Sequence, residues 1–207
     1  MRRSAVLGTV VLLLAACGGG ARKAAPPATR PPASSAAPPA TTTATPGPSA
    51  LQAEANSVAA GDIPDNQVFL RLRNPAAGYS IKYPEGWAQS GNGARVTFRD
   101  KNNIVRIVVL RAARPTTAHV ARELAALGGA QVRQAPQTLK LPGAVAVKAT
   151  YATRSAPNSV TGKRVTLVVD RYYLWRGGKE AIVDLATPVG VDNVDAYRLM
   201  IESFRWS

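Results

Sequence analysis

The chain has 207 residues, a formal net charge of +14, one cysteine and one histidine. A single cysteine excludes a disulfide within one molecule, and one cysteine with one histidine cannot form a zinc site. The sequence also lacks a Walker-type loop, a Gly-x-Ser-x-Gly elbow and a His-Glu-x-x-His motif. We therefore expect no cofactor, no metal and no nucleic-acid partner.

The N-terminus has the parts of a secretory signal peptide. Arg2 and Arg3 precede an apolar run that ends in Leu14-Ala15-Ala16-Cys17, and this run is shorter than the roughly 20 residues that span a bilayer. The last four residues resemble the lipobox of bacterial lipoproteins, in which the cysteine is acylated. We predict a signal peptide over residues 1–17, a lipid anchor on Cys17 and an extracytoplasmic, membrane-tethered protein. A chance cysteine after an ordinary signal peptide is the alternative.

Residues 18–62 are predicted to form a disordered tether. From Gly18 to about Ser49 the chain is mainly Ala, Pro, Thr, Gly and Ser, with eight of the 16 prolines and no acidic residue. A segment with so little apolar surface cannot offset its chain entropy, and its proline pairs favour an extended geometry of about 3.1 Å per residue. The segment is either a stalk that lifts a domain off the membrane or a passive spacer.

Residues 63–207 have the size of one domain, and their first half alternates apolar and polar residues in four short runs. Alternation with a period of two indicates strands, and the Asn-Pro, Pro-Glu-Gly and Lys-Asn-Asn sequences between the runs indicate turns. Gly91-Asn92-Gly93 predicts another turn, because a strand rather than a helix follows it. The predicted strands are residues 68–73, 79–83, 95–100 and 104–111.

The second half begins with a helix. Pro115-Thr116-Thr117 predicts its start, since a hydroxyl side chain caps the first turn, and Gly128-Gly129 predicts its end. A polar crossing with a short strand near Val132 follows. A terminal helix begins near Asp192-Asn193, where Asp195 completes a capping box. The remaining predicted strands are residues 145–151, 164–175 and 180–186, and the apolar stripe predicted for the last helix is Val194, Tyr197, Ile201 and Phe204.

This order of elements, joined mainly by hairpins, predicts an antiparallel α+β layered domain. The segment from Gly78 to Trp87 (GYSIKYPEGW), with the strands and helix after it and Ile201-Glu202-Ser203-Phe204 near the end, resembles the PsbP/Mog1-like superfamily, specifically actinobacterial lipoproteins of the LpqN type. The resemblance covers about residues 66–205. It implies an α/β/α sandwich, a binding or assembly role and a link to envelope biogenesis, and it transfers no functional residue.

The candidate binding site is inferred from the distribution of basic residues. Residues 51–207 contain 21 basic and 12 acidic residues, an excess of nine positive charges, which indicates an anionic lipid, polymer or protein partner. If the apolar parity of the strands, from Tyr79 to Val169, is buried together, six cations project from the opposite parity. That face is either a docking site for the anionic partner or an ordinary solvated surface. The six cations are Lys82, Arg95, Arg99, Arg106, Lys148 and Arg164.

Catalytic candidates are few. Asp170 and Asp184 could face each other across neighbouring strands and serve as an acid/base pair, or they could be solvated or ion-paired. His119 is predicted to be a solvated helix residue.

Four aromatic residues could either line a ligand pocket or pack in the core. They are Trp87, Tyr172, Tyr173 and Trp175.

The sequence therefore predicts a monomeric, non-catalytic, membrane-tethered binding lipoprotein of the cell envelope. The alternative is an envelope hydrolase that uses paired carboxylates.

Overall fold

The structure is a computed structural model that describes residue 52 and residues 60–158 and 160–207. The chain divides into two compact units, residues 1–45 and 46–207, and the fold described here belongs to the second. The predicted signal peptide, Cys17 and the greater part of the predicted tether lie outside the described residues. Among the described residues, no helix has the length and apolar character needed to cross a membrane.

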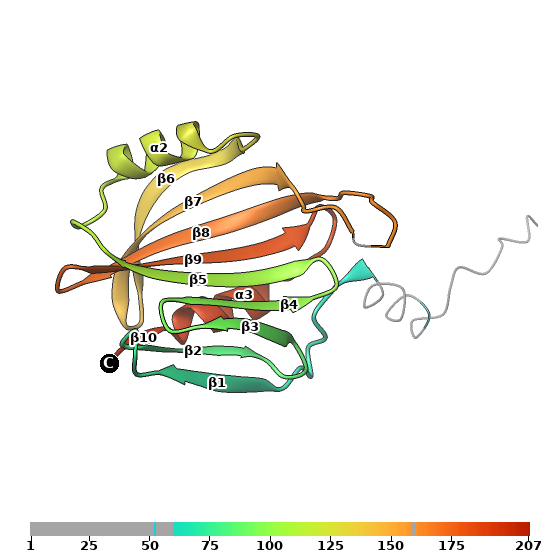
Figure 1. Cartoon of the computed structure of the whole chain (residues 1–207), viewed down its shortest axis with the longest axis horizontal. Helices are drawn as coiled ribbons and strands as arrows, with labels where there is room; N and C mark the ends of the chain where they lie inside the picture. Colours follow the sequence, from blue (N-terminus) through green and yellow to red (C-terminus); the bar gives the residue numbers. More distant parts are fainter. Residues whose placement is uncertain (1–51, 53–59, 159) are drawn as a thin grey trace, which may run out of the picture. The chain divides into compact units, whose positions relative to one another are not determined.

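The centre of the fold is an antiparallel sheet of seven strands (Figure 1). Two helices, α2 (Thr117–Ala126) and α3 (Val194–Glu202), pack on opposite faces of it, and we call these the α2 face and the α3 face. The strands in spatial order are β3 (Ala88–Asn92), β4 (Arg95–Asp100), β5 (Asn103–Arg111), β9 (Lys179–Pro188), β8 (Thr166–Arg176), β7 (Ala144–Arg154) and β6 (Gln131–Leu141).

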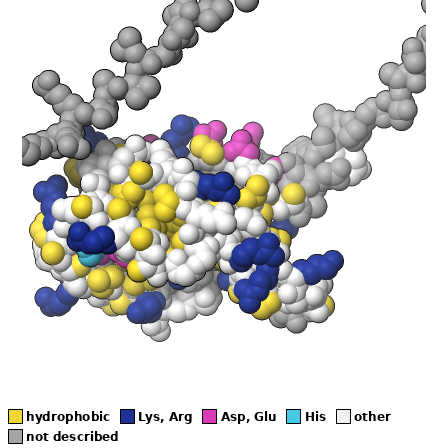
Figure 2. All heavy atoms as spheres, turned by 90° about the horizontal axis from the view of Figure 1, so that it is seen from above, with side chains coloured by type: hydrophobic (Ala, Val, Ile, Leu, Met, Phe, Trp, Pro, Cys, Tyr) yellow, Lys and Arg dark blue, Asp and Glu magenta, His cyan; other side chains and the backbone are white. Residues whose placement is uncertain are grey.

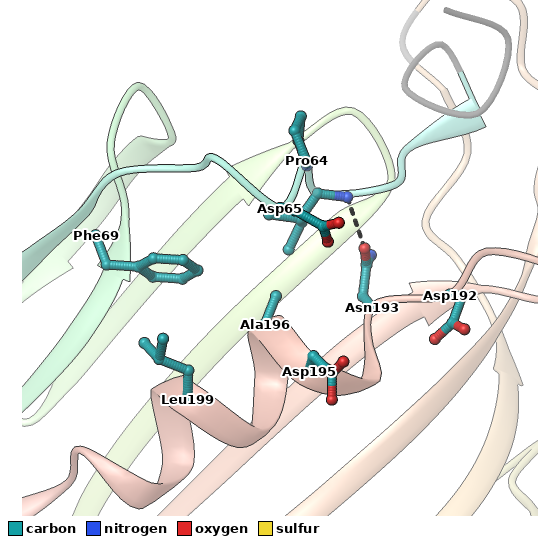
Figure 3. Close-up of a pocket in the computed structure, with 9 residues that line it drawn as sticks. Pro64, Asp65, Phe69, Asp192, Asn193, Asp195, Ala196 and Leu199 are labelled. Carbon is teal, nitrogen blue, oxygen red and sulfur yellow. Dashed lines mark hydrogen bonds between the residues drawn. The ribbon is translucent and has the colours of Figure 1, made fainter. Parts of the chain in front are cut away.

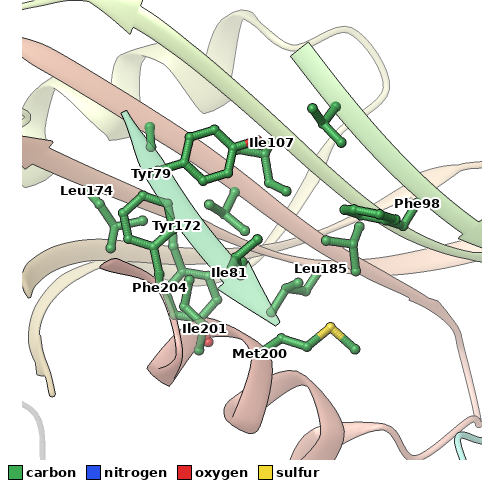
Figure 4. Packing of buried hydrophobic residues seen from close by; sticks show 14 of the residues in the cluster. Tyr79, Ile81, Phe98, Ile107, Tyr172, Leu174, Leu185, Met200, Ile201 and Phe204 are labelled. Atoms are coloured by element: carbon green, nitrogen blue, oxygen red, sulfur yellow. The ribbon is translucent and has the colours of Figure 1, made fainter. Parts of the chain in front are cut away.

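A small antiparallel sheet joins α3 on its side of the molecule. It consists of β1 (Phe69–Asn74), β2 (Tyr79–Pro84) and the two-residue β10 (Arg205–Trp206). Buried residues of β2, α3 and the α3 face form one hydrophobic cluster (Figure 4). In it the ring of Phe204 stacks on Tyr79 at a centroid distance of 5.6 Å, and Tyr83 stacks on Phe98 at 4.1 Å. The predicted α/β/α arrangement of helices on an antiparallel sheet is confirmed.

The helix starts agree with the sequence in one case and differ in the other. The Thr116 side chain caps α2 by accepting a hydrogen bond from the backbone N–H of His119, as predicted. The capping box predicted for the last helix is wrong, because the N-cap residue is Asn193, whose side chain makes no capping bond. Val194, predicted to lie in the apolar stripe, is 69% exposed, whereas Tyr197, Met200 and Ile201 are buried.

Asn193 instead ties the start of the described chain to the core. Its side chain donates to the Gly61 carbonyl and accepts from the backbone N–H of Ile63, and Asn103 also donates to the Gly61 carbonyl. Gly61 is buried and has a φ of +118°, a conformation that glycine adopts readily. Gly61, which we assigned to the tether, therefore contacts the folded domain.

The assumption that one parity is buried together along the sheet is wrong. Odd-numbered residues of β5 and β9, such as Ile107 and Val183, face α3 and pair with each other. The two-residue turn between β8 and β9 pairs Arg176 with Lys179, so an odd-numbered residue of β9 lies opposite an even-numbered residue of β8. In β7 and β8 the odd-numbered residues consequently face α2. Val147, Leu167 and Val169 are buried there and not on the α3 face.

Three strands differ from the sequence prediction. β3 and β10 were not predicted, and β6 is an eleven-residue strand where only a short strand near Val132 was expected. β6 is an edge of the seven-stranded sheet, and its pairing with β7 has register shifts between Val132 and Gln134 and between Gln134 and Gln137. A turn connects β3 to β4 as predicted, but it consists of Gly93 and Ala94, because Gly91 and Asn92 are the last paired residues of β3.

Candidate functional site: an apolar groove beside α3

A groove of about 550 Å³ opens on the α3 face. Strands β7, β8 and β9 form its floor, β6 forms one wall, and α3 with the loop before it forms the other. Small-molecule sites in proteins usually occupy about 300–1,000 Å³ and are mostly apolar with a few polar groups. The apolar lining residues are Leu139, Leu141, Val168, Tyr172, Leu185, Pro188, Val189, Val191, Val194, Tyr197 and Ile201.

The groove is fixed from both sides. Tyr197 of α3 donates a hydrogen bond of 2.7 Å from its hydroxyl to the Ala186 carbonyl of β9, which holds the helix against the sheet. Tyr197 and Ile201 are buried in the core beneath α3 and also line the groove. The opposite wall, β6, stands at the edge of the sheet, so the groove lies between a packed helix and an edge strand.

Lys148 and Asp170 form a polar pair on the floor of this apolar groove. Their side chains are joined at 2.8 Å, and the Thr150 hydroxyl donates to Asp170 at 2.6 Å. The Lys148 ammonium also lies 5.4 Å from the ring centroid of Tyr172. Burial on its own lowers the pKa of Lys148, but the hydrogen bond and the charge of Asp170 outweigh it, so the pKa is raised. Lys148 is therefore a stable cation neutralised by its neighbour.

This pair determines which polar group the groove can accept. Asp170 balances Lys148 on the floor, and the other charged lining residues, Lys140, Arg198 and Glu202, belong to the walls. An ammonium next to a carboxylate offers a donor and an acceptor side by side, which matches a hydroxyl, since a hydroxyl both donates and accepts. The arrangement fits a molecule with an apolar body and a hydroxyl-bearing polar group.

The six predicted cations do not form one surface. Arg95, Arg99 and Arg106 project from β4 and β5 onto the α2 face, as their pairing with Val108, Ile104 and Thr97 requires. Figure 2 shows one face of the molecule, on which Lys and Arg side chains are separated by hydrophobic and uncharged ones.

The other three cations lie elsewhere. Lys148 is on the α3 face, in the groove. Lys82 is on the small sheet, where its backbone N–H donates to the Ser203 hydroxyl. Arg164 precedes β8 and donates to the Ser155 carbonyl. The expected single basic face is therefore wrong, because the β8–β9 turn reverses the parity, and the binding role of the individual residues stays a prediction.

Asp170 and Asp184 do not face each other. In the register of β8 and β9, Asp170 lies opposite Leu185, and Asp184 lies opposite Arg171. Asp184 projects onto the α2 face, where Arg171 Nε and Nη2 donate to its two oxygens at 2.6 and 3.0 Å and Arg106 Nε donates at 3.0 Å. The predicted acid/base pairing of these two carboxylates is wrong, and both are ion-paired.

The ion pair of Asp184 belongs to a buried polar cluster under α2. Glu123 of α2 lies 3.5 Å from Arg171, and the Arg171 guanidinium lies 5.3 Å from the Tyr151 ring. Burial raises the pKa of Tyr151 to about 12. Glu180 is only 4% exposed on the same face, and its burial, together with the charge of Glu123, raises its pKa. These groups join α2 to the sheet.

The four aromatic residues that could line a pocket also lie in different parts of the fold. Tyr172 lines the groove, whereas Tyr173 is fully buried on the α2 face. Trp87 is buried in the core beneath α3, and Trp175 donates from Nε1 to the Ala112 carbonyl. The four rings therefore do not line one pocket. His119 is exposed on α2, 4.0 Å from Glu123.

A smaller hollow of about 260 Å³ lies at the start of α3 (Figure 3). Three carboxylates, those of Asp65, Asp192 and Asp195, line it. Asp192 accepts a hydrogen bond from the backbone N–H of Val194, and Asp195 pairs with Arg198, so two of the three already stabilise the helix start. No group of three or more His, Cys, Asp or Glu side chains in the described part of the chain is placed to hold a metal ion.

The fold is similar to that of a solved PsbP structure. Cyanobacterial PsbP (CyanoP) from Synechocystis sp. PCC 6803 has 18% identity and a TM-score of 0.52, and the match covers 71% of this chain and 98% of that one. The Ran-binding protein Mog1p of Saccharomyces cerevisiae has 10% identity and a TM-score of 0.44, with 68% and 96% covered. LpqN of Mycobacterium tuberculosis, involved in cell envelope biogenesis, has 15% identity and a TM-score of 0.39, with 68% and 85% covered.

The match to a solved structure from Bacteroides thetaiotaomicron (12% identity, TM-score 0.48) covers 66% of this chain and about half, 48%, of that chain. No protein-family model and no curated protein matches the sequence. The likenesses to solved structures therefore concern the fold, and membership of the LpqN type stays a prediction.

Sequence reasoning identified Lys148 and Tyr172 but not the groove they share. The groove depends on where α3 lies and on the register of β6, β7 and β8, neither of which is visible in residue patterns. One signal was available, because Val189, Val191 and Val194 are apolar residues around the connection between β9 and α3. Apolar residues in an exposed connection are typical of a binding site.

Proposed function

We propose that this chain is a membrane-tethered, non-catalytic binding lipoprotein of the bacterial cell envelope, and that its α3-face groove holds an amphiphilic ligand. The observation that carries the proposal is the groove itself, an apolar cavity of about 550 Å³ with the neutralised Lys148–Asp170 pair on its floor. An apolar chain would lie along the wall residues, and a hydroxyl-bearing group would meet the pair.

The sequence supports the location. The Leu14-Ala15-Ala16-Cys17 lipobox and the Pro-rich segment after it match a protein that is exported, acylated and held at a distance from the membrane. Amphiphiles with an apolar chain are abundant in that compartment. The anionic partner indicated by the net charge belongs to surfaces outside the groove, because the groove floor is electrically balanced.

The experiment fills the groove with one side chain. Val168 lines it from β8, so Val168→Trp is expected to occupy the space that the apolar chain needs. Val132→Trp is the matched control, since Val132 is exposed on β6 and is not among the groove residues. The probe is a monoacylglycerol below its aggregation threshold, titrated calorimetrically into the chain from Gly18 onward.

We expect Val168→Trp to weaken monoacylglycerol binding at least about tenfold, which corresponds to losing roughly two buried methylenes. Val132→Trp should change it less than about twofold. A fatty acid of equal chain length should bind more weakly than the monoacylglycerol, because its carboxylate meets Asp170. Undiminished binding by Val168→Trp, with its fold intact, would overturn the proposal.

The hydrolase alternative loses its basis, since Asp170 and Asp184 project onto opposite faces and each is paired with a cation. We propose binding, and not hydrolysis, as the function.

A further inference from the structure

The described domain begins at a definable end of the sheet. Gly61 contacts Asn103, which directly follows the β4–β5 turn at Lys101 and Asn102. The connection between β7 and β8 lies at this same end. Both β5 and β8 pair with β9 in antiparallel register, so Ile104 at the start of β5 and the start of β8 lie beside the same end of β9, near Thr187. The β7–β8 connection leads into the start of β8. Figure 1 shows the chain entering the fold beside these two connections. We call this the tether end.

Cations gather at the tether end. Five exposed basic side chains belong to the β4–β5 turn and the β7–β8 connection or the strand residues next to them. Within the described residues, no carboxylate forms an ion pair with Arg99, Arg154, Lys163 or Arg164. The five residues are Arg99, Lys101, Arg154, Lys163 and Arg164.

Two of these cations, Arg99 and Lys101, line a hollow. A polar depression of about 320 Å³ lies between the two connections, with Arg99 and Lys101 on one side and residues 155–158 on the other. None of its lining residues is acidic. Asp100, between Arg99 and Lys101 in the sequence, alternates to the other face of β4, and Asp62 and Asp192 lie near the start of α3.

The connection that carries three of the cations is built by specific bonds. Arg164 Nη1 donates to the Ser155 carbonyl at 2.7 Å, and Arg154 Nη2 donates to the Arg164 carbonyl at 3.3 Å. The Ser155 hydroxyl accepts from the backbone N–H of Val165, and the Asn158 side chain accepts from two further backbone N–H groups. These bonds hold the cations beside the hollow without neutralising them.

We propose that the tether end docks on the membrane through Arg99, Arg154, Lys163 and Arg164, which bind the phosphate of anionic phospholipid headgroups. The choice of a membrane over a polymer or a protein comes from the chain itself. The segment that leads to Cys17 joins the fold at this end, so the anchoring bilayer is the anionic surface that these cations reach first. Clustered Lys and Arg side chains bind such surfaces cumulatively. The inference rests on the tethering part of the proposed function and not on the groove.

Docking in this orientation has a consequence for the groove. The backbone N–H of Val189 donates to the Thr166 carbonyl at 3.0 Å, which places the loop that bounds the groove at the tether end as well. The groove opens on the α3 face, and Arg99 lies on the α2 face. A domain docked through the cations therefore holds one end of its groove close to the lipid surface.

The test measures vesicle binding by the unlipidated chain from Gly18 onward, which retains every residue of the described fold. Sedimentation is compared for vesicles of phosphatidylglycerol with phosphatidylcholine and for vesicles of phosphatidylcholine alone, at about 50 mM and about 200 mM salt. The variant is Arg99→Glu with Lys163→Glu. The matched control is Arg111→Glu with Arg114→Glu, which makes the same charge change at exposed positions after the other end of β5.

We expect binding to the anionic vesicles only, a steep decrease at the higher salt, and a loss of about tenfold or more in the Arg99→Glu, Lys163→Glu variant. The control should lose less than about threefold. Equal losses in the two variants would show an effect of net charge alone and overturn the proposal, as would equal binding to both kinds of vesicle. Monoacylglycerol titration of the same variants separates the two proposals, because it should be unaffected by either double substitution.

Discussion

Arg171 and Asp184 face each other across β8 and β9 and are joined by two hydrogen bonds, of 2.6 and 3.0 Å, inside the layer beneath α2. Their side chains are 5% and 6% exposed. Burial disfavours the charged form of Arg171, yet the hydrogen bonds and charge of Asp184 more than compensate, and the pKa of Arg171 is raised. A charge held in this way depends on its partner.

Asp184→Ala should therefore lower the free energy of unfolding by about 3–5 kcal/mol, because it leaves the buried Arg171 cation with only the more weakly bonded Glu123, 3.5 Å away. Replacing both partners, Arg171→Met with Asp184→Leu, should cost less than the single substitution. Urea unfolding followed by circular dichroism measures both. A loss below about 1 kcal/mol in Asp184→Ala would mean that water replaces the carboxylate.

The terminal helix is predicted to be docked through Phe204, which is 1% exposed and packs between Tyr79 and Trp206. Phe204→Ala should cost about 3–5 kcal/mol, because it removes a buried ring and leaves a cavity. Val194→Ala on the same helix is the control and should change stability by less than about 0.5 kcal/mol. Similar effects of the two substitutions in thermal unfolding would contradict the observed packing.

The start of the domain can be tested by truncation. A chain that begins at Ala60 keeps the Gly61 carbonyl, which accepts from Asn103 and Asn193, and a chain that begins at Ile63 loses it. Both chains should fold, because the core lies in later residues, but the shorter one should be about 1–3 kcal/mol less stable. Equal midpoints of chemical unfolding would show that residues 60–62 contribute nothing.

Glu180 predicts a pH dependence. Its burial and the charge of Glu123 raise its pKa above the ordinary 4.5, against a smaller opposing effect of His119. The folded protein therefore binds this proton more tightly than the unfolded chain, so the stabilisation is present below pH 4.5 and is lost as the pH rises through the raised pKa. Glu180→Gln should match the parent protein at pH 4 and exceed its stability at pH 7.

Glu85→Gln serves as the control for Glu180→Gln, since Glu85 is exposed. Its stability relative to the parent protein should not depend on pH between 4 and 7. Differential scanning calorimetry of the three proteins at both pH values gives the comparison, and a Glu180→Gln curve parallel to that of the parent would count against a raised pKa.

The lipid anchor is tested at Cys17, the only cysteine of the chain. Cys17→Ala should abolish incorporation of labelled palmitate in the native host, because acylation requires the thiol, and should release the protein from the membrane fraction. Thr42→Ala in the predicted tether should leave labelling unchanged. Palmitate labelling of Cys17→Ala at the parental level would exclude this residue as the anchor.

Much of the sheet was predictable because its inner strands alternate strongly. The runs at 79–83, 95–100 and 104–111 correspond closely to β2, β4 and β5. β3 escaped prediction because Ala88–Asn92 has no branched or aromatic side chain and is exposed throughout, so it becomes a strand only by pairing with β4. Tertiary pairing, and not local preference, forms such a strand.

Single residues of the groove could be predicted from the sequence, but their pairing could not. Lys148 was identified as a cation, but its partner Asp170 lies on the neighbouring strand, two residues from the position directly opposite Lys148. That relation depends on the register of β7 and β8, and a shift of one residue would move one of the two to the other face. The burial of Arg171 could not be predicted for the same reason. A cation is expected on the solvated surface, but Arg171 is enclosed by Asp184 and α2.

The irregular pairing of β6 with β7 has a consequence for association between molecules. An eleven-residue strand at the edge of a sheet presents unpaired backbone groups that can recruit a strand from another copy. Two register shifts interrupt β6, and Pro136, within the second of them, has no N–H to donate. Arg133 and Lys140 add like charges along the same edge. The strand that forms one wall of the groove is thus poorly suited to edge-to-edge aggregation, although it is a long exposed edge.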